Sequence, residues 1–371
     1  MAVQLDLMKL SKRKHTDMVG LRFELCAQQD FVLRAHYAKG LHAWFLNQIQ
    51  DYNPPLSTYL HDGQSEKPFS MSRLGGGTVA ENLRLVAGDR HEWSLHLLSP
   101  EAVDGVLAWL WAVKPSLLWL GSGKVTELTI ERVSVSLQPN TYQGLWRKKL
   151  RDKVTLSFLS PTGFRRRGGH LPLPLPRNIF QSYLRRWQDF SGFAVETNNF
   201  LDWVDEFVVI RQHRIETRSV AAGKAGAVTG FIGSVQFAVR PEGKNQKNFW
   251  CLFSALGSFA PYCGTGHKTS FGLGFTVSGQ VDLPVLIDLD EQLFLQRVES
   301  LRELFSAQRQ KYQGDRTQRI TELWALIFAR RERGESLQDI AFDLGIHYET
   351  AKTYLKRARR SLSNLEYDHS E

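Results

Sequence analysis

The sequence predicts an α+β protein in which two β-α-β-β-α-β segments precede an all-α region. Two observations support this expectation. Some segments alternate between apolar and polar residues, as half-buried strands do, and in others apolar residues recur at helical spacing. The order of these two kinds of segment repeats along the chain. From about residue 293 onward, only the helical pattern continues. Since β-α-β-β-α-β is the ferredoxin-like order, we expect two tandem ferredoxin-like domains followed by a helical region with a helix-turn-helix.

The first predicted domain covers residues 1–145. It opens with an alternating strand at 19–25. A helix follows over 37–49, because apolar residues recur every fourth position on one face, and the pair Pro54-Pro55 ends it. The other expected elements are strands at 69–74 and 83–98, the latter folded into a hairpin at Gly88-Asp89, a helix near 102–113 and a strand at 125–137.

The second predicted domain covers residues 146–288 and repeats this order. The two halves share no detectable sequence repeat, so the duplication rests on element order alone. The expected elements are a strand at 154–159, a proline-rich turn at 171–176, a helix through 179–190, strands at 207–217 and 230–239, a helix near 245–256 and a last strand at 274–281.

The third predicted region, residues 289–371, contains a helix-turn-helix pattern centred on Gly345. Apolar residues bracket this glycine at helical spacing on both sides. The second helix carries five basic residues against the single acid Glu349, which suits contact with phosphates. A solvated basic face of a helical cap is the alternative. The residues expected to bind nucleic acid are Lys352, Lys356 and Arg357.

Composition and charge limit the classes of function. The 371 residues carry a formal net charge of +9, so a polyanion such as nucleic acid is the first candidate partner. The longest apolar run, 106–113, is too short to cross a membrane, and the charged N-terminus does not resemble a secretory signal. The cysteines Cys26, Cys251 and Cys263 are scattered, which favours small core residues in a reducing cytoplasm over disulfides or a zinc site. No cofactor is expected.

A glycine-rich run between Tyr262 and Phe275 has the spacing G-x-G-x5-G-x-G. It lacks the third glycine of a dinucleotide fingerprint and the Gly-Lys-Ser/Thr of a phosphate-binding Walker loop. It therefore suits a loop that another backbone approaches closely, with amides available to a phosphodiester. A structural glycine-rich hairpin is the alternative. The residues expected to contact RNA here are Gly264, Gly266, His267, Lys268, Gly272 and Gly274.

The run followed by Phe-Gly-Leu-Gly-Phe resembles the most diagnostic motif of the CRISPR-associated repeat-processing endoribonucleases, which cut precursor CRISPR RNA within each repeat. Three further stretches agree in sequence and order, and the resemblance spans about residues 19–285. They are 40–42 with 53–61 (NPPLSTYLH), 67–72 (KPFSMS), and 159–162 (LSPT) with Leu173-Pro174 and Arg186-Trp187.

The resemblance implies two tandem ferredoxin-like domains and metal-independent chemistry. In that chemistry, the ribose 2′-hydroxyl attacks the adjacent phosphate and leaves a 2′,3′-cyclic phosphate and a 5′-hydroxyl, which calls for a base, an acid and a cation. By position, His61 and His42 match catalytic histidines of different members, and Lys67 matches the charge-stabilising lysine. A first-helix tyrosine of some members has no clear match at 43–46, so which histidine is the base stays open.

The expected partner is a CRISPR repeat RNA that forms a stem-loop. The run Arg165, Arg166 and Arg167 is expected to contact the RNA backbone, although charge runs are also common on solvated faces. Two alternatives stay open: a DNA-binding regulator led by the helix-turn-helix, whose pattern resembles a sigma-factor module, and a non-catalytic RNA-binding subunit of a CRISPR effector complex. The helix-turn-helix could contact DNA, RNA or protein, and other effector subunits are further candidate partners.

Overall fold

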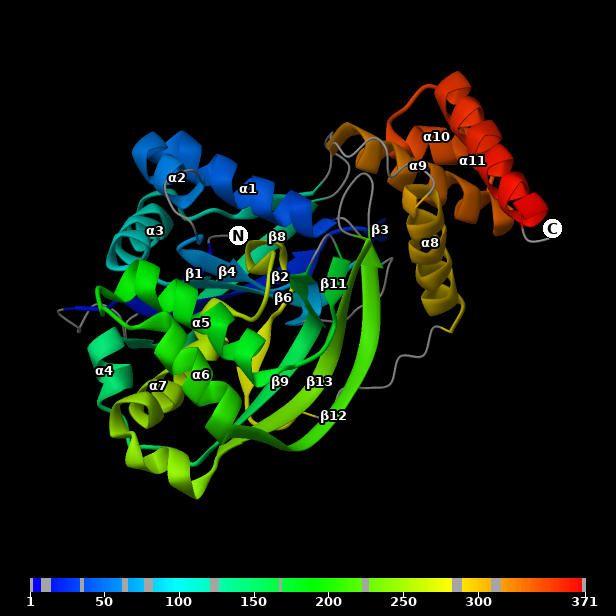
Figure 1. Cartoon of the computed structure of the whole chain (residues 1–371). Helices are drawn as coiled ribbons and strands as arrows, with labels where there is room; N and C mark the ends of the chain where they lie inside the picture. Colours follow the sequence, from blue (N-terminus) through cyan, green and yellow to red (C-terminus); the bar gives the residue numbers. More distant parts are fainter. Residues whose placement is uncertain are drawn as a thin grey trace. The chain divides into compact units, whose positions relative to one another are not determined.

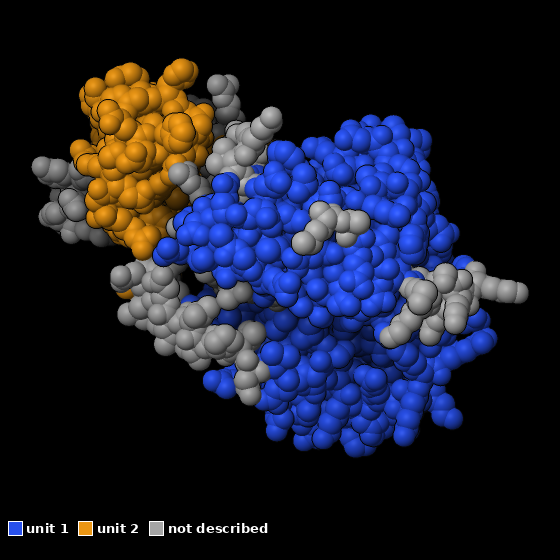
Figure 2. All heavy atoms as spheres, turned by 180° about the vertical axis from the view of Figure 1, so that it is seen from behind, with its two compact units in different colours: residues 1–218, 229–284 blue, residues 219–228, 285–371 orange. Residues whose placement is uncertain are grey.

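The chain divides into two compact units, formed by residues 1–218 with 229–284 and by residues 219–228 with 285–371 (Figure 2). None of the described helices is long and apolar enough to cross a membrane. The computed structural model describes residues 3–7, 15–33, 37–61, 66–76, 83–120, 127–166, 169–221, 227–281, 289–307 and 315–368.

The first half of the larger unit is a ferredoxin-like domain. Its sheet has the order β8-β2-β6-β4, so the first strand lies between the fourth and the third, as the ferredoxin-like plan requires. Strands β1 and β7 extend the sheet beside β8. The elements are β1 (Gln4–Asp6), β2 (Met18–Ala27), β3 (Phe31–Leu33), α1 (Tyr37–Tyr52), α2 (Pro54–His61), β4 (Phe69–Met71), the 3-10 turn η1 (Leu74–Gly76), β5 (Leu83–Leu85), β6 (Arg90–Leu97), α3 (Pro100–Val113), β7 (Leu117–Trp119) and β8 (Glu127–Asn140).

The alternation in β2 places its apolar side chains in the core. Val19, Leu21 and Phe23 are fully buried, whereas Arg22 and Glu24 between them are half-buried. These side chains pack against the buried faces of α1 and α3. The local sequence pattern therefore positions α1, the helix that carries His42, on one face of the sheet.

One local expectation for this domain was wrong, whereas the end of the first helix before Pro54-Pro55 is confirmed, at Tyr52. The chain does turn at Gly88-Asp89, but β5 pairs with β3 and β6 pairs with β2, so the two strands form no hairpin. The turn is bonded to the end of β2, because the Gly88 amide donates a hydrogen bond to the Ala27 carbonyl at 2.8 Å. The prolines after α1 also begin a second helix, α2, because proline is tolerated in a first helical turn; the Asn53 side chain accepts a hydrogen bond from the Leu56 amide at 3.1 Å.

The second half is also ferredoxin-like, which confirms the predicted tandem fold. Its sheet has the order β12-β13-β9-β14, and α5, α6 and α7 cover one face of it (Figure 1). The boundary at 145/146 stays a prediction. The elements are α4 (Tyr142–Trp146), β9 (Lys153–Thr162), β10 (Phe164–Arg166), β11 (Gly169–Leu171), α5 (Pro176–Ser191), α6 (Thr197–Phe207), β12 (Val208–Ala221), β13 (Ala227–Val239), the 3-10 turn η2 (Pro241–Asn245), α7 (Lys247–Cys263), the 3-10 turn η3 (Thr269–Phe271) and β14 (Thr276–Ser278).

The structure adds elements that the sequence pattern did not indicate. A short antiparallel hairpin, β10 with β11, precedes the proline-rich turn, and α6 follows α5. Helix α7 runs on to Cys263, so the glycine-rich run begins inside a helix. The expectation that all three cysteines are core residues holds only for Cys263, because Cys26 and Cys251 are half-buried; all three are free thiols.

The smaller unit contains four described helices. Leu301, Phe305 and Ala325 belong to a core between α8 and α9, whereas Ile327 and Ile340 belong to a second core that α9 shares with α10 and α11. A turn at Gly345 separates α10 from α11, and their assignment as a helix-turn-helix module stays a prediction. The helices are α8 (Leu289–Ala307), α9 (Asp315–Glu332), α10 (Leu337–Leu344) and α11 (Tyr348–Asp368).

Candidate functional site

The glycine-rich run of the second domain packs against the first domain. It leaves α7, forms the 3-10 turn η3, and ends in β14. The turn η3 contacts both α1 and β4. A loop from one ferredoxin-like domain thus completes a site that begins on the first helix of the other.

His42 is the centre of this site. It is only 8% exposed on α1, and its Nδ1 lies 2.9 Å from the Ser270 carbonyl oxygen of η3. The ring stacks on Phe271, with centroids 4.1 Å apart. A carbonyl oxygen only accepts hydrogen bonds, so Nδ1 carries the proton and the lone pair of the neutral ring lies on Nε2.

The surroundings of His42 keep its ring neutral. Burial lowers its pKa to about 4, the hydrogen bond to Ser270 opposes this shift, and the nearby charges of His61 and Lys67 add to the lowering. At neutral pH, Nε2 of His42 is therefore unprotonated. The two residues whose charges act on the His42 ring, His61 and Lys67, are the ones that the resemblance named as catalytic together with it.

His61 and Lys67 reach this site from two separate segments. His61 is the exposed last residue of α2, whose buried side includes Leu56 and Leu60. Lys67 is half-buried and comes just before β4. Residue Glu66, beside Lys67, forms ion pairs with two arginines of α5.

Arg186 connects the Lys67 segment to the glycine-rich run. Its Nε lies 3.1 Å from the Glu66 carboxylate, and its other nitrogens donate to the Gly266 carbonyl at 2.8 Å and to the Ser182 hydroxyl at 3.0 Å. The Arg186 side chain is only 4% exposed. The sequence marked Arg186 as part of a motif, but no local signal indicated this bridging contact.

The glycines of the run are required by close backbone contacts. Gly266 and Gly274 have φ values of 77° and 63°, and a Cβ on either would lie within 2.5 Å of a carbonyl oxygen, at Gly163 or Thr265 respectively. Most amides here are engaged inside the protein, contrary to the expectation that they are available to a phosphodiester: those of residues 265, 266, 267 and 274 each donate to a protein oxygen. The RNA contact predicted for Gly264, Gly266, Gly272 and Gly274 stays a prediction.

His267 and Lys268 lie beside the β10–β11 hairpin. The His267 Nδ1 lies 2.8 Å from the Gly163 carbonyl, and its ring stacks on His170 at 5.2 Å between centroids. Burial lowers the pKa of His267, the hydrogen bond to Gly163 opposes this, and Lys268 and Arg165 lower it further. The sequence reasoning missed His170, which the hairpin register places opposite Arg165.

The remaining predicted nucleic-acid contacts are divided between the two units. Arg165 is exposed on β10, whereas the Arg166 side chain and all of Arg167 lie outside the described residues. Lys352, Lys356 and Arg357 are exposed on α11 of the smaller unit. The described basic residues therefore belong to two different units.

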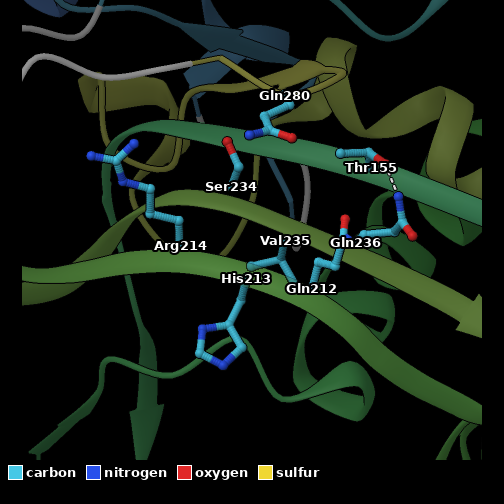
Figure 3. A pocket seen from close by; sticks show the side chains of 8 residues that line it. All are labelled: Thr155, Gln212, His213, Arg214, Ser234, Val235, Gln236 and Gln280. Carbon is cyan, nitrogen blue, oxygen red and sulfur yellow. Dashed lines mark hydrogen bonds between the residues drawn. The ribbon is translucent and has the colours of Figure 1, made fainter.

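An open groove of about 360 Å³ lies on the sheet of the second domain (Figure 3). The Gln236 amide donates to the Thr155 hydroxyl at 3.1 Å within it. This groove was not predicted from the sequence, although polar residues alternate along β12 and β13. Its lining residues are Thr155, Gln212, His213, Arg214, Ser234, Val235, Gln236 and Gln280.

Among the described residues, no group of three or more His, Cys, Asp or Glu side chains is arranged to hold a metal ion. The candidate site includes two imidazoles, of His42 and His61, and the ammonium group of Lys67. Such a set supplies groups for proton transfer and for the stabilisation of negative charge.

The chain is similar to proteins of one family. Residues 156–276 match the family model described as CRISPR-associated endoribonuclease Cas6. The Streptococcus thermophilus protein of that name is 26% identical over 241 residues, which cover 63% of this chain and 87% of that protein. The one from Mycobacterium tuberculosis is 25% identical over 263 residues, covering 70% and 77%.

Solved structures show the same fold. A Cas6 product complex aligns with a TM-score of 0.59 at 24% identity, covering 71% of this chain and all of that one. Thermus thermophilus Cas6 aligns with a TM-score of 0.55 at 22% identity, covering 72% and 100%. The predicted motifs, the tandem fold and these relatives agree, and together they support a CRISPR repeat-processing endoribonuclease that is similar to the Cas6 proteins.

Proposed function

We propose that the protein cleaves precursor CRISPR RNA within its repeats by metal-independent attack of a ribose 2′-hydroxyl on the adjacent phosphate. The products are a 2′,3′-cyclic phosphate and a 5′-hydroxyl. One observation carries the proposal: a buried neutral histidine, His42, is electrostatically coupled to a second histidine and a lysine. These are the groups that the reaction needs.

The contacts of His42 support its assignment as the base. Its Nε2 is unprotonated at neutral pH and makes no hydrogen bond within the described part of the chain, so it is open to accept the 2′-hydroxyl proton. A phosphate bound nearby raises the pKa of this ring and so strengthens it as a base. His61, the second imidazole, then protonates the leaving 5′-oxygen, and Lys67 stabilises the charge on the phosphorane oxygens.

RNA is recognised by shape and backbone contacts in this proposal. Arg165 and Lys268 place positive charge around the His267 ring beside the β10–β11 hairpin, which suits the phosphates of a repeat stem-loop. The polar groove on the second sheet offers amide and guanidinium groups to unpaired bases. The free, scattered cysteines favour a reducing compartment, so we place the protein in the cytoplasm.

Two substrate experiments test the reaction. Repeat RNA is expected to be cut in EDTA, and a 2′-deoxy nucleotide before the scissile phosphate is expected to abolish cutting, because the nucleophile is then missing. Cutting of the deoxy substrate, or a requirement for a divalent ion, contradicts the mechanism. Tight binding of repeat RNA with no product at all identifies the protein as a non-catalytic subunit instead.

Three substitutions test the site. His42→Ala, His61→Ala and Lys67→Ala are each expected to lower single-turnover cleavage by about 10²–10⁴-fold, the usual contribution of a proton-transfer or charge-stabilising group, while repeat binding is retained. Lys39→Ala, on the exposed face of α1, is the control and is expected to cleave normally. An unchanged rate in any of the three removes that residue from the site.

A further inference from the structure

The smaller unit holds one helix rigidly with a basic face turned outward. Helix α10 is capped by the Ser336 hydroxyl, which accepts from the Asp339 amide at 3.1 Å, and it ends at Gly345 in the left-handed region with φ of 62°. Helix α11 begins three residues later. Buried Ala351 and Leu355 anchor α11 in the core that it shares with α9 and α10. This packing fixes which side of α11 is exposed.

The exposed side of α11 is strongly basic. Its exposed residues include Lys352, Lys356, Arg357, Arg359 and Arg360, with Glu349 as the one acid among residues 348–362. Within the part of the chain that the structure describes, no carboxylate forms an ion pair with Lys356, Arg357 or Arg359. The acids Glu335 and Asp343, in contrast, both bind Arg330 and so do not oppose this charge.

Helices α10 and α11 also expose aromatic side chains. Phe342, on the helix that precedes the turn, is 83% exposed, and Tyr348 at the start of α11 is 44% exposed. The two rings supply apolar contact area in addition to the charge of α11. The helix-turn-helix therefore presents both charge and apolar contact area to a partner.

The geometry points to duplex DNA as that partner, and we propose that α11 docks in its major groove. A single α-helix fits the wide major groove of B-form DNA, whereas the major groove of A-form RNA is too narrow to admit it. In this arrangement the first turns of α11, with Tyr348, Glu349 and Lys352, face the base edges. Lys356 and Arg357, further along, contact phosphates. The binding site is separate from the His42 site and does not depend on the proposed RNA cleavage.

The test uses the full chain and a fluorescent DNA duplex of mixed sequence, about 30 base pairs or roughly three helical turns long. The double variant Lys356→Gln, Arg357→Gln is expected to bind at least about tenfold more weakly at moderate salt. Loss of two phosphate contacts is expected to reduce the slope of log K against log salt by about 1.8. The matched control, Arg240→Gln with Lys247→Gln, removes the same charge from exposed positions on the larger unit and is expected to bind like the parent.

The outcomes separate this proposal from its rivals. Weaker DNA binding by the α11 variant alone, with normal cleavage of repeat RNA and an unchanged melting temperature, supports it. Absence of DNA binding by the parent chain, or an equal loss in the control variant, overturns it, because bulk charge alone then accounts for any binding. Equal competition by an RNA duplex of the same length also overturns it.

Discussion

Two neighbouring arginines of α5, Arg185 and Arg186, allow a matched test of the contacts that link the Glu66 segment to the glycine-rich run. Arg185 and Arg186 both form ion pairs with Glu66, at 2.7 and 3.1 Å, but their side chains are 57% and 4% exposed respectively. Only Arg186 also donates to the Gly266 carbonyl and to Ser182. The two substitutions Arg185→Met and Arg186→Met therefore remove the same charge and one contact to the same carboxylate, from different environments.

The expected costs differ by several kcal/mol. Breaking a buried ion pair by removing one partner costs about 3–5 kcal/mol, because the other charge and its hydrogen-bonding groups remain buried without compensation. An exposed pair contributes only about 0–1 kcal/mol. For a unit of this size, the Arg186→Met change corresponds to a melting temperature lower by roughly 10 °C, whereas Arg185→Met shifts it by no more than about 3 °C.

Differential scanning calorimetry of the two variants measures this difference directly. Cleavage of repeat RNA, assayed well below the melting temperature of the weaker variant, measures the effect on the site. Arg186→Met is expected to slow cleavage, because Glu66 and the glycine-rich run are no longer joined beside Lys67, while Arg185→Met cleaves normally. Melting temperatures that fall equally in both variants would refute the reasoning, since burial would then not determine the contribution of the pair.

Two further predictions concern stability. Gly274→Ala is expected to disrupt the glycine-rich run, because its Cβ would lie 1.8 Å from the Thr265 carbonyl oxygen; Gly279→Ala, with φ of 91° and no atom within 4 Å, should cost only about 1–2 kcal/mol in chemical denaturation. Stability should also fall between about pH 6.5 and pH 4, because His42 and His96, with pKa values lowered to about 4 by burial, take up protons in the unfolded chain before they do so in the folded one. Each contributes about 3 kcal/mol to this loss, so His96→Gln is expected to flatten the pH dependence of urea unfolding, and an unchanged dependence would contradict it.

The sequence predicted the helices and strands whose residues show a regular apolar spacing within the element itself. The alternation at 19–25 and the helical spacing at 37–49 correspond to β2 and α1, and the order of such elements was enough to predict the tandem fold. Pairing between distant strands was not predictable in this way. From local sequence, strand β5 could pair with β3 or with β6; in the structure it pairs with β3, and the Gly88 amide donates to the Ala27 carbonyl at the end of β2.

In the candidate site, too, some residues could be named from the sequence and others only from contacts between distant segments. His42, His61 and Lys67 were named through the resemblance of their motifs, because a single histidine on a helix carries no signal of catalysis by itself. Arg186 was part of a motif without a role, and His170 was not singled out. Their roles arise from contacts with Glu66 and His267 across the fold, which no spacing in the sequence encodes.

The Ser270 carbonyl makes the state of His42 depend on the second domain. The hydrogen bond that assigns the His42 proton to Nδ1 comes from the second ferredoxin-like domain, while His42, His61 and Lys67 all belong to the first. The stack of Phe271 on the His42 ring and the link from Arg186 to Glu66 come from the second domain as well. A first domain that folds without the second therefore has all three reactive side chains but neither the tautomer nor the burial that keeps His42 neutral. In the proposed mechanism, catalysis therefore requires the two domains packed together, and it requires the glycines that permit this packing as well as the histidines.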